Sequence, residues 1–212
     1  VTYNRLEMLK KALDKFDNQT QKADYVLIVN NASSDGTNKY LEDWKNLKKD
    51  YEKIVINLNE NTGGSGGFYE GLKVASKRDA DWIWVSDDDA FPKENALEEA
   101  TKFLEKSKNK EKISAICARI INNGAIDLFH RKIIKYGLLS IKLKPSKAED
   151  YLKDSFEVDG FTYVGTILNK EILKQVGLTK KDYFIYWDDV EHAYRMSRKG
   201  KIIVVPKVEV EH

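Results

Sequence analysis

Three consecutive carboxylates, Asp87-Asp88-Asp89, follow the predicted strand Trp82–Ser86 and carry the sharpest chemical signal in the sequence. Side chains alternate along an extended chain, so we expect Asp87 and Asp89 to project together and Asp88 to point away. Two carboxylates on one side of a strand end suit a hard divalent cation. The alternative is a solvated acidic turn that caps the next helix. Three like charges beside a buried strand are costly without a cation, so the pattern favours a metal site.

A glycine-rich segment, Asn61–Gly67, lies between a predicted strand and a predicted helix. Glycine lets a ligand approach the backbone closely, and helix N-termini bind phosphate. The segment is not a P-loop, because no Lys-Ser/Thr pair follows its last glycine. It also departs from the dinucleotide fingerprint, since Gly66 is followed at once by Gly67. A phosphate cradle and a flexible turn both remain open.

A third polar cluster lies in the segment Tyr186–Arg195, and it has two interpretations. Asp188 and Glu191 have the spacing of a helix capping box, and Glu191 and Arg195 have that of a helical ion pair. One cap needs only one aspartate, which leaves Asp189 free beside two aromatic residues. A free carboxylate there could act as a general base on a bound hydroxyl.

The histidines and the single cysteine add little by themselves. We expect His192 at the surface of the predicted helix. His212 follows a C-terminal strand and gains interest only if Asp89 holds a metal, because imidazole completes many mixed oxygen and nitrogen sites. Cys117 lies in an apolar run and is expected to be a buried, inert thiol. One cysteine excludes a disulfide framework and a cysteine-based zinc site.

Composition excludes several classes of protein. The 212 residues are 42% hydrophobic and 33% charged, as expected of one globular domain. The 36 basic and 34 acidic residues leave a net charge of only +2, which gives no electrostatic case for nucleic acid as a partner. No run of 18 apolar residues exists to span a membrane. We therefore expect a cytoplasmic protein, with membrane association that is at most peripheral.

The segment 128–148 differs from the rest because it holds six basic residues and no acidic one. These are Arg131, Lys132, Lys135, Lys142, Lys144 and Lys147. Apolar residues alternate with them, which would suit an amphipathic element at a membrane surface or acceptor. The other interpretation, which we favour, is a two-sided hairpin with solvated lysines.

Strands and helices alternate through the first two thirds of the chain. Apolar runs at 25–29, 54–58 and 82–86 predict strands, and helical periodicity follows each of them. Val1-Thr2 has the pattern of a strand tail whose start lies before Val1. Such βα repeats predict an α/β fold with a mostly parallel central sheet flanked by helices. Ligands bind at the carboxyl ends of such strands, where the polar clusters lie.

In this order, the motifs resemble those of the family 2 inverting glycosyltransferases with the GT-A fold. The closest likeness is to the galactofuranosyl- and rhamnosyltransferase branch. It is carried by Asn61-x-Gly63-Gly64-Ser65-Gly66-Gly67-Phe68, Asp87-Asp88-Asp89, Phe184-x-x-Trp187-Asp188-Asp189-x-Glu191 with Arg195, and a closing Val-x-His. The resemblance implies a GT-A (Rossmann-like) sheet with a smaller mixed acceptor-side region. It implies one catalytic domain, 1–212, with a nucleotide-sugar-binding half at 1–127 and an acceptor-binding half at 128–212.

The resemblance also implies roles for individual residues. The nucleotide-sugar site would comprise Thr2, Tyr3, Asn4, Arg5, Asn30, Asn31, Asp35, Asn61, Gly63, Gly64, Asp87 and Asp88. Asp87, Asp89 and His212 would hold Mn²⁺ or Mg²⁺. Asp189 would be the catalytic base with Asp188 as its neighbour, and Trp187 and Glu191 would line the acceptor site. Where the family usually has an aspartate that accepts the pyrimidine N–H, this chain has Asn30, whose carbonyl accepts without charge assistance.

The function that the resemblance implies is metal-dependent transfer of a sugar with inversion. The donor would be a UDP- or dTDP-linked galactofuranose, rhamnose or other hexose. The acceptor would be a glycan or a lipid-linked glycan in cell-surface polysaccharide synthesis. Two alternatives stay open at this point, a sugar-nucleotide nucleotidyltransferase and a non-catalytic domain that binds nucleotide or glycan.

Overall fold

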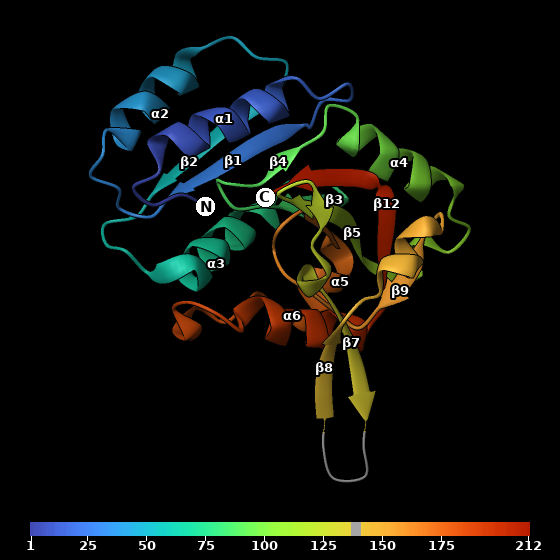
Figure 1. The fold of residues 1–212 in the computed structure, drawn as a ribbon. Coiled ribbons are helices and arrows are strands. Elements are labelled where there is room, and N and C mark those ends of the chain that lie inside the picture. Colours follow the sequence, from blue (N-terminus) through green and yellow to red (C-terminus); the bar gives the residue numbers. More distant parts are fainter. Residues whose placement is uncertain (137–140) are drawn as a thin grey trace.

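The computed structural model describes residues 1–136 and 141–212 (Figure 1). Its helices are α1 (Leu6–Asp17), α2 (Thr37–Asn46), α3 (Gly63–Ala75), α4 (Ala96–Lys106), α5 (Lys170–Val176) and α6 (Asp188–Ser197). Its strands are β1 (Tyr25–Asn30), β2 (Glu52–Asn57), β3 (Trp82–Val85), β4 (Phe91–Pro92), β5 (Ile113–Asn122), β6 (Ala125–Ile126), β7 (Arg131–Tyr136), β8 (Ile141–Pro145), β9 (Phe156–Val158), β10 (Gly160–Phe161), β11 (Thr166–Asn169) and β12 (Lys201–Glu211). Short 3-10 turns are η1 (Lys110–Lys112), η2 (Leu128–His130), η3 (Ala148–Leu152) and η4 (Lys181–Tyr183).

The main sheet runs in the order β3-β11-β5-β12-β4, with β6 beside β5 and β9 beside β12. Strands β1 and β2 form a separate parallel pair, and β10, β7 and β8 form a third small sheet. The α/β class is confirmed, but the expectation of a mostly parallel sheet is only partly confirmed. Among the described strands, only β1–β2 and β5–β12 pair in parallel. Strands β9, β10 and β11 instead run antiparallel to strands that are distant in the chain, namely β12, β7, and β3 with β5.

The β1–β2 pair shows why the apolar run at 25–29 forms a strand. Its side chains alternate between two faces. Ile28 packs with α1 and α2 in a cluster around Leu41 and Trp44. On the other face, a methyl group of Val29 lies 3.1 Å from the position that a Cβ on Gly71 of α3 would take. The strand is thus covered on both sides, which explains why its sequence is continuously apolar.

The middle of the molecule is β5, which is buried from Ile113 to Ala118. Cys117 lies there with no exposed surface, as the apolar run predicted, and burial raises the pKa of its thiol. The second half of the chain completes this sheet, because β11 and β12 lie on either side of β5. Helix α6 packs beneath it through Ala193 and Met196, so the polar N-terminus of α6 is fixed relative to the sheet.

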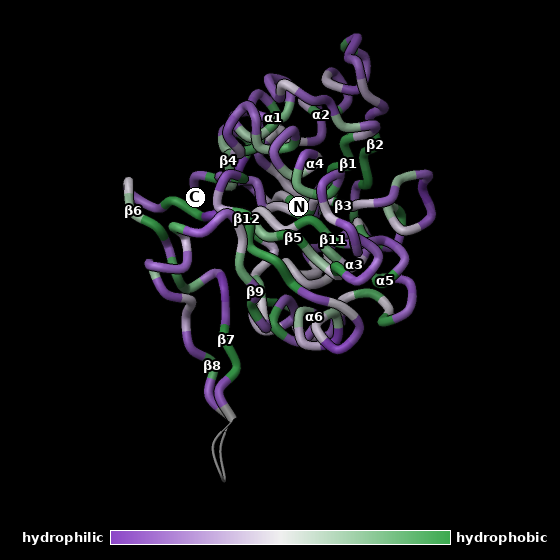
Figure 2. Tube along the Cα trace, turned by 90° about the vertical axis from the view of Figure 1, so that its right-hand side faces the viewer, coloured by the Kyte–Doolittle hydropathy of each residue, from purple (hydrophilic) through white to green (hydrophobic). Residues whose placement is uncertain are grey.

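Strands β7 and β8 form a hairpin that projects from the body, which confirms the favoured interpretation of the basic segment (Figure 2). One of its six basic residues differs from the prediction. Arg131 is fully buried, and its guanidinium donates to the backbone carbonyls of Ala118, Val164 and Gly165 at 2.9–3.3 Å. A planar, five-donor group can satisfy several carbonyls at once, so Arg131 anchors the base of the hairpin to β5.

Candidate active site

The acidic run Asp87–Asp89 follows the end of β3, as predicted, but it does not continue the strand. The strand ends at Val85, and Asp88 and Asp89 lie in a turn. The prediction that Asp88 points away from its neighbours, based on strand alternation, is therefore wrong in part. The side chains of Asp88 and Asp89 both reach one guanidinium, that of Arg5.

Asp88 is the buried member of the run, with 5% of its surface exposed. The hydroxyl of Thr2 donates to its Oδ2 at 2.6 Å, and the Nη1 of Arg5 donates to its Oδ1 at 3.1 Å. The same Nη1 donates to Asp89 at 2.7 Å. The N-terminal segment predicted to contact the nucleotide is thus tied to the acidic turn. Tyr3 of that segment is exposed and free to meet a ligand.

Asp89 also contacts His212, whose Nε2 lies 3.4 Å from its Oδ1. The sequence places these residues 123 positions apart, and β12 brings them together by ending beside β5, where the His212 amide donates to Ile121. The imidazole lowers the pKa of Asp89, and the carboxylate raises the pKa of His212. Asp87 is close enough for its charge to act on both groups.

The donor set suits a divalent cation in kind, since carboxylate oxygens and an imidazole nitrogen bind Mn²⁺ and Mg²⁺. Burial raises the pKa of Asp87, with the charges of Asp89 and Asp88 adding to that effect, as expected where a cation would relieve repulsion. These side chains do not yet surround one common point, as the ligands of a metal ion would. Over residues 1–136 and 141–212, no three acidic, histidine or cysteine side chains form a group that could hold a metal. Asp89 and His212, which lie 3.4 Å apart, would hold such an ion together with Asp87.

The glycine-rich segment is helical rather than a loop, because α3 begins at Gly63. Gly63 has a φ of +71°, and a Cβ there would lie 2.0 Å from the carbonyl oxygen of Phe184. Only glycine fits both constraints. Gly64 is different, since a Cβ there would meet nothing within 4 Å. The first turn of α3 therefore has open space beside it and N–H groups directed outward, which suits an anion.

Asn31 connects the end of β1 to the start of α3. Its amide nitrogen donates to Asn61 and to the carbonyl of Gly63, and its Oδ1 accepts from the amide and hydroxyl of Thr62. Asn31 is 2% exposed, so these contacts use its hydrogen-bonding groups inside the protein. Asn31 therefore holds Asn61 and the start of the glycine-rich helix in position.

Two other predicted nucleotide contacts also make internal bonds. Asn30 has no exposed surface, and its amide donates to Asn38 and Asn57 while its Oδ1 accepts from Ser33. Asp35 accepts from the first amide of α1 through one oxygen, and from the amide and hydroxyl of Thr37 at the start of α2 through the other. One carboxylate thus caps two helices. Burial acts to raise the pKa of Asp35, but these donors outweigh it and lower the pKa.

Asn4 has a φ of +53° and braces the same corner of the site. Its amide donates to the hydroxyl of Ser33, and its Oδ1 accepts from the amide of Ser34 at 2.7 Å. Asparagine tolerates this left-handed conformation better than most residues. The structure therefore brings Thr2–Arg5 and the loop after β1 together.

The capping box predicted at the start of α6 is wrong. The N-cap is Trp187, in the left-handed conformation with no side-chain cap, and Asp188 is the first helical residue. The predicted ion pair is confirmed, since Arg195 binds Glu191 at 2.8 Å. Glu191 also lies 3.4 Å from Lys180. Because Trp187 occupies the N-cap position and Asp188 lies one residue later, the side chain of Asp188 is not placed to cap the helix.

Asp188 and Asp189 differ in accessibility, and the difference bears on their roles. Asp188 is 6% exposed, and burial raises its pKa. Asp189 is only half-buried, and burial together with the charge of Asp188 raises its pKa to about 6. The charge of Asp87 adds to this effect, so the start of α6 faces the acidic turn. A reachable carboxylate with such a pKa is suited to accept a proton near neutral pH.

The residues before α6 form an exposed aromatic segment, Tyr183–Trp187. Tyr186 is 73% exposed and Trp187 is 61% exposed, so the two aromatic residues before Asp189 are open to solvent. Phe184, Tyr186 and Trp187 all have positive φ, which costs energy for bulky residues and marks functional segments. The Phe184 carbonyl accepts from the amide of Ser65, so this segment lies on the N-terminus of α3.

His192 was expected at the surface of α6 and is instead fully buried. Its Nδ1 lies 2.6 Å from the hydroxyl of Tyr163, and its Nε2 lies 3.1 Å from the carbonyl oxygen of Gly177. A carbonyl can only accept, so Nε2 carries the proton and Nδ1 accepts from the tyrosine. Burial lowers the pKa of His192 to about 4, and the ring remains neutral.

We predict that His192 makes the protein less stable as the pH falls from about 6.5 towards 4. The unfolded histidine takes up a proton near pH 6.5, whereas the folded one does so only near 4, so the stabilisation is complete above 6.5. The contribution lost between pH 7 and 5 is about 2 kcal/mol. Urea unfolding of the wild type and His192→Gln at both pH values measures it. Equal pH dependence in the two proteins would contradict the prediction.

One neighbour of the site was missed at the sequence level. His130 packs edge-on against His212 with ring centroids 5.2 Å apart, and its Nδ1 lies 2.7 Å from the hydroxyl of Thr162. Burial lowers its pKa to about 4, so it is a neutral support for His212. No local pattern marks it, because it comes from η2 and its partners come from distant strands.

Two curated relatives are similar to this chain over most of its length. Galactofuranosyltransferase GlfT1 of Mycolicibacterium smegmatis is 24% identical over 200 residues, which cover 94% of this chain and 64% of the relative. The uncharacterized glycosyltransferase YwdF of Bacillus subtilis is 26% identical over 188 residues, covering 89% of this chain and 63% of YwdF. The chain thus spans a little under two thirds of the length of these relatives.

Solved structures give the fold. TarS 1-349 of S. aureus matches 99% of this chain and 58% of its own, with a TM-score of 0.69 and 17% identity. Mannosyltransferase PcManGT of Pyrobaculum calidifontis, in complex with GDP-Man and Mn²⁺, matches 100% of this chain and 54% of its own, with a TM-score of 0.69 and 19% identity. The expected GT-A fold is confirmed. The model of the family described as "Glycosyl transferase family 2" matches residues 1–177, and the chain therefore belongs to that family.

Proposed function

We propose that this protein transfers a sugar from a nucleoside-diphosphate sugar to a hydroxyl of a glycan, with inversion at the anomeric carbon. The proposal rests on one observation, namely that a candidate diphosphate site and a candidate general base lie close together. The first turn of α3 suits a diphosphate, the acidic turn suits the divalent cation that would accompany it, and Asp189 at the start of α6 suits a general base. The charge of Asp87 reaches Asp189, so both ends of the reaction fit in one site.

In this mechanism, Asp189 takes the proton of the acceptor hydroxyl while that oxygen attacks the anomeric carbon. The bond from that carbon to the diphosphate oxygen breaks in the same step, and a single displacement inverts the centre. Asp188 stays buried, and its charge helps to raise the pKa of Asp189, which keeps the base near its working range. The helix α6 holds both carboxylates, and its packing on the sheet fixes where they point.

The departing diphosphate gathers negative charge, and the N–H groups at the start of α3 are positioned to receive it. In the structure, one of these N–H groups, that of Ser65, donates to the Phe184 carbonyl. A bound diphosphate would accept the hydrogen bond of the Ser65 amide in place of that carbonyl. When bound, Mn²⁺ or Mg²⁺ would neutralise the same charge as a Lewis acid, with Asp87, Asp89 and His212 as the residues to hold it.

The donor and the metal are supported by analogy. TarS has been solved with UDP, and PcManGT with GDP-Man and Mn²⁺. The relatives at 23–24% identity are galactofuranosyltransferases. We propose a UDP- or dTDP-linked hexose, such as galactofuranose or rhamnose, as the donor. Asn30 is buried and internally bonded, so it is a support of the base pocket in this proposal and not a charged reader of the base.

The half 128–212 is proposed to bind the acceptor, in cell-surface polysaccharide synthesis. Trp187 offers an exposed aromatic face for a sugar ring, and Glu191 lies one helical turn beyond it. A lipid-linked acceptor is supported by the hairpin. Lys135 pairs directly with Lys142 across β7 and β8, with Lys144 on the same face, and like charges opposite each other are unfavourable without an anionic partner.

No helix in the described part of the chain has the length and apolar character to cross a bilayer. From the facing lysines of the hairpin we propose peripheral binding to an anionic membrane surface. We expect replacement of Lys135, Lys142 and Lys144 by serine to reduce binding to anionic phospholipid vesicles about 10²-fold, at about 1 kcal/mol per lysine. The matched control replaces three exposed lysines elsewhere, Lys11, Lys39 and Lys199. Equal loss in both variants would remove the case for the hairpin.

A panel of nucleotides tests the donor site directly. We expect UDP or dTDP with Mn²⁺ to raise the melting temperature by several degrees at concentrations well above Kd, because a ligand that binds only the folded state stabilises it. Asp88→Ala should abolish the shift, since Asp88 holds Thr2 and Arg5. Glu94→Ala is the control on a neighbouring exposed acid. A panel in which no nucleotide shifts the melting temperature would contradict the proposal.

A further inference from the structure

The first turn of α6 carries the candidate base, and its N-cap residue cannot hold it in place. That residue is Trp187, an exposed side chain with a φ of +68°. An indole has no acceptor for the free N–H groups of a helix N-terminus. Ala193 and Met196 pack the later turns of α6 into the core. The position of Asp189 therefore depends on contacts that the first turns make with the body of the protein.

The hydroxyl of Tyr163 makes one of these contacts. It lies 2.6 Å from the Nδ1 of His192, which is three positions after Asp189 on the same helix. The other ring nitrogen of His192 donates to the carbonyl oxygen of Gly177, so Nδ1 is the acceptor and the tyrosine donates. Both side chains are buried. This hydrogen bond ties the start of α6 to the connection between β10 and β11.

A second buried hydroxyl supports the same turn. Thr179 donates to the backbone carbonyl oxygen of Asp188 at 3.4 Å. Burial raises the pKa of Tyr163 well above its ordinary value, and the charges of Asp188 and Asp189 add to this effect. Tyr163 therefore keeps its proton as a donor, and its hydroxyl lies close to both carboxylates of the first turn.

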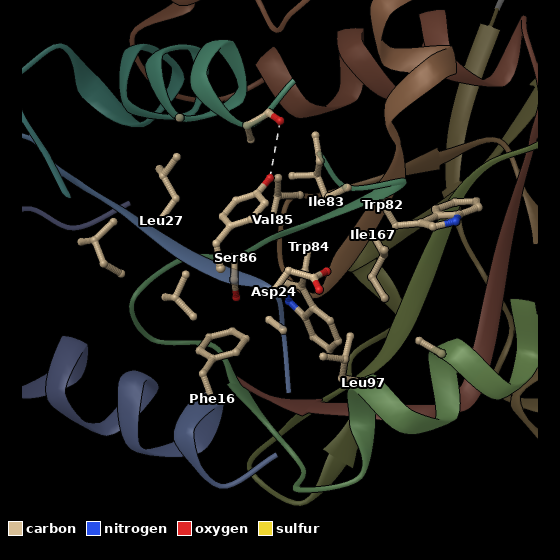
Figure 3. Close-up of a pocket in the computed structure, with 18 of the residues that line it drawn as sticks. Phe16, Asp24, Leu27, Trp82, Ile83, Trp84, Val85, Ser86, Leu97 and Ile167 are labelled. Atoms are coloured by element: carbon tan, nitrogen blue, oxygen red, sulfur yellow. Dashed lines mark hydrogen bonds between the residues drawn. The ribbon is translucent and has the colours of Figure 1, made fainter. Parts of the chain in front are cut away.

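The ring of Tyr163 also contacts α3, the helix proposed to receive the diphosphate. Its centroid lies 4.5 Å from that of Phe68, and Phe68 follows Ser65 by three positions on α3. Phe68 also borders a cleft of about 440 Å³ between β1 and β3, where Leu27 and Val85 form part of the wall (Figure 3). The Tyr163 ring thus packs against α3 while its hydroxyl holds α6.

We infer that Tyr163 is a positioning residue, which sets the separation between the diphosphate site at the start of α3 and the base at the start of α6. The inference rests on the proposed function, because it concerns the distance across which Asp189 must meet the acceptor hydroxyl. Reacting atoms must approach to about 3–3.5 Å, and a displacement of about 1 Å can cost about 10²-fold in rate. Since Tyr163 is buried, it acts through the two helices and not by contact with substrate.

A role in stability alone is the alternative, and the chain offers a matched control. Tyr151 is also buried, its hydroxyl lies 3.2 Å from that of Ser146, and its ring centroid lies 4.9 Å from that of Phe156. These partners belong to η3, β9 and the residue after β8. Tyr163→Phe and Tyr151→Phe therefore each remove one buried hydroxyl contact, but only the first of these contacts is made with α6.

Steady-state kinetics separates the two roles. We expect both variants to lower the melting temperature by a few degrees, because each loses a buried hydrogen bond. Tyr163→Phe should lower kcat about tenfold and leave the KM for the nucleotide sugar within about twofold of the wild type, because the base moves and the donor site does not. Tyr151→Phe should keep the kcat of the wild type. Thr179→Val should lower kcat in the same direction as Tyr163→Phe, and Thr179→Ser, which retains the hydroxyl, should restore it.

Amide hydrogen exchange reports on α6 without turnover. The amides of Glu191 and His192 should exchange at least tenfold faster in Tyr163→Phe than in Tyr151→Phe. Equal kcat in the two variants would overturn the inference, whether or not exchange differs, and so would a raised KM with unchanged kcat. A wild type that forms no glycoside would instead reject the proposed function. That outcome is distinct from a failure of the inference, in which the wild type turns over and the two variants behave alike.

Discussion

Asp189→Asn is expected to lower kcat by on the order of 10²-fold or more while leaving the affinity for the nucleotide unchanged. Asparagine keeps the shape of the side chain but cannot accept a proton, and a lost general base costs about this much. The starting point is favourable for a base, because burial and the charge of Asp188 raise the pKa of Asp189 to about 6. Steady-state kinetics and nucleotide calorimetry on the same protein separate the two effects.

Asp188→Asn is the matched control. This residue is buried at the first position of α6, so we expect a lower melting temperature and a smaller loss of kcat. The wild type should gain activity as the pH rises through about 6, where Asp189 loses its proton, and then reach a plateau. A larger kinetic loss in Asp188→Asn than in Asp189→Asn would mean that the roles are exchanged.

Removal of divalent cation is expected to reduce turnover by on the order of 10³-fold, because a Lewis acid at the diphosphate is worth several kcal/mol. Asp89→Ala and His212→Ala should each weaken Mn²⁺ binding at least tenfold, measured by calorimetry in the presence of nucleoside diphosphate. Glu211→Ala is the control on the neighbouring exposed acid. Activity that persists in chelator would contradict the metal role.

The pH dependence of Mn²⁺ binding adds a test of His212 itself. An imidazole must be neutral to bind Mn²⁺, and Asp89 raises the pKa of His212, so the protonated form persists to higher pH. We therefore expect the affinity for Mn²⁺ to increase as the pH rises through the pKa of His212. His212→Ala should flatten this increase. An unchanged pH dependence in the variant would assign His212 to the ion pair with Asp89 alone.

The fold was accessible from the sequence where local patterns decide it. The strands near 25–29, 54–58 and 82–86 lie where the apolar runs predicted them. The antiparallel strands of the second half could not be predicted in the same way. Their partners are distant in sequence, and no crossover helix in the sequence indicates which strands pair. Sheet direction is set by tertiary pairing, and local sequence carries little of it.

The site was predictable in its acidic residues and not in their surroundings. The pairing of Asp89 with His212 was suggested only through the family resemblance, and the structure brings the two together. The burial of Arg131 and His192 could not be predicted, because both are polar residues whose partners are backbone carbonyls or a distant tyrosine. The positive φ values of Phe184, Tyr186 and Trp187 likewise leave no local signal in the sequence.

The central claim is tested most directly by identifying the products from a nucleotide sugar. The protein is incubated with UDP- and dTDP-hexoses, Mn²⁺ and a glycan or lipid-linked acceptor, and the nucleotide product and the anomeric configuration of the transferred sugar are determined by chromatography and NMR. The account predicts a nucleoside diphosphate and an inverted glycoside in equal amounts, both lost in Asp189→Asn. Release of pyrophosphate, a retained configuration, or binding without any product would contradict it.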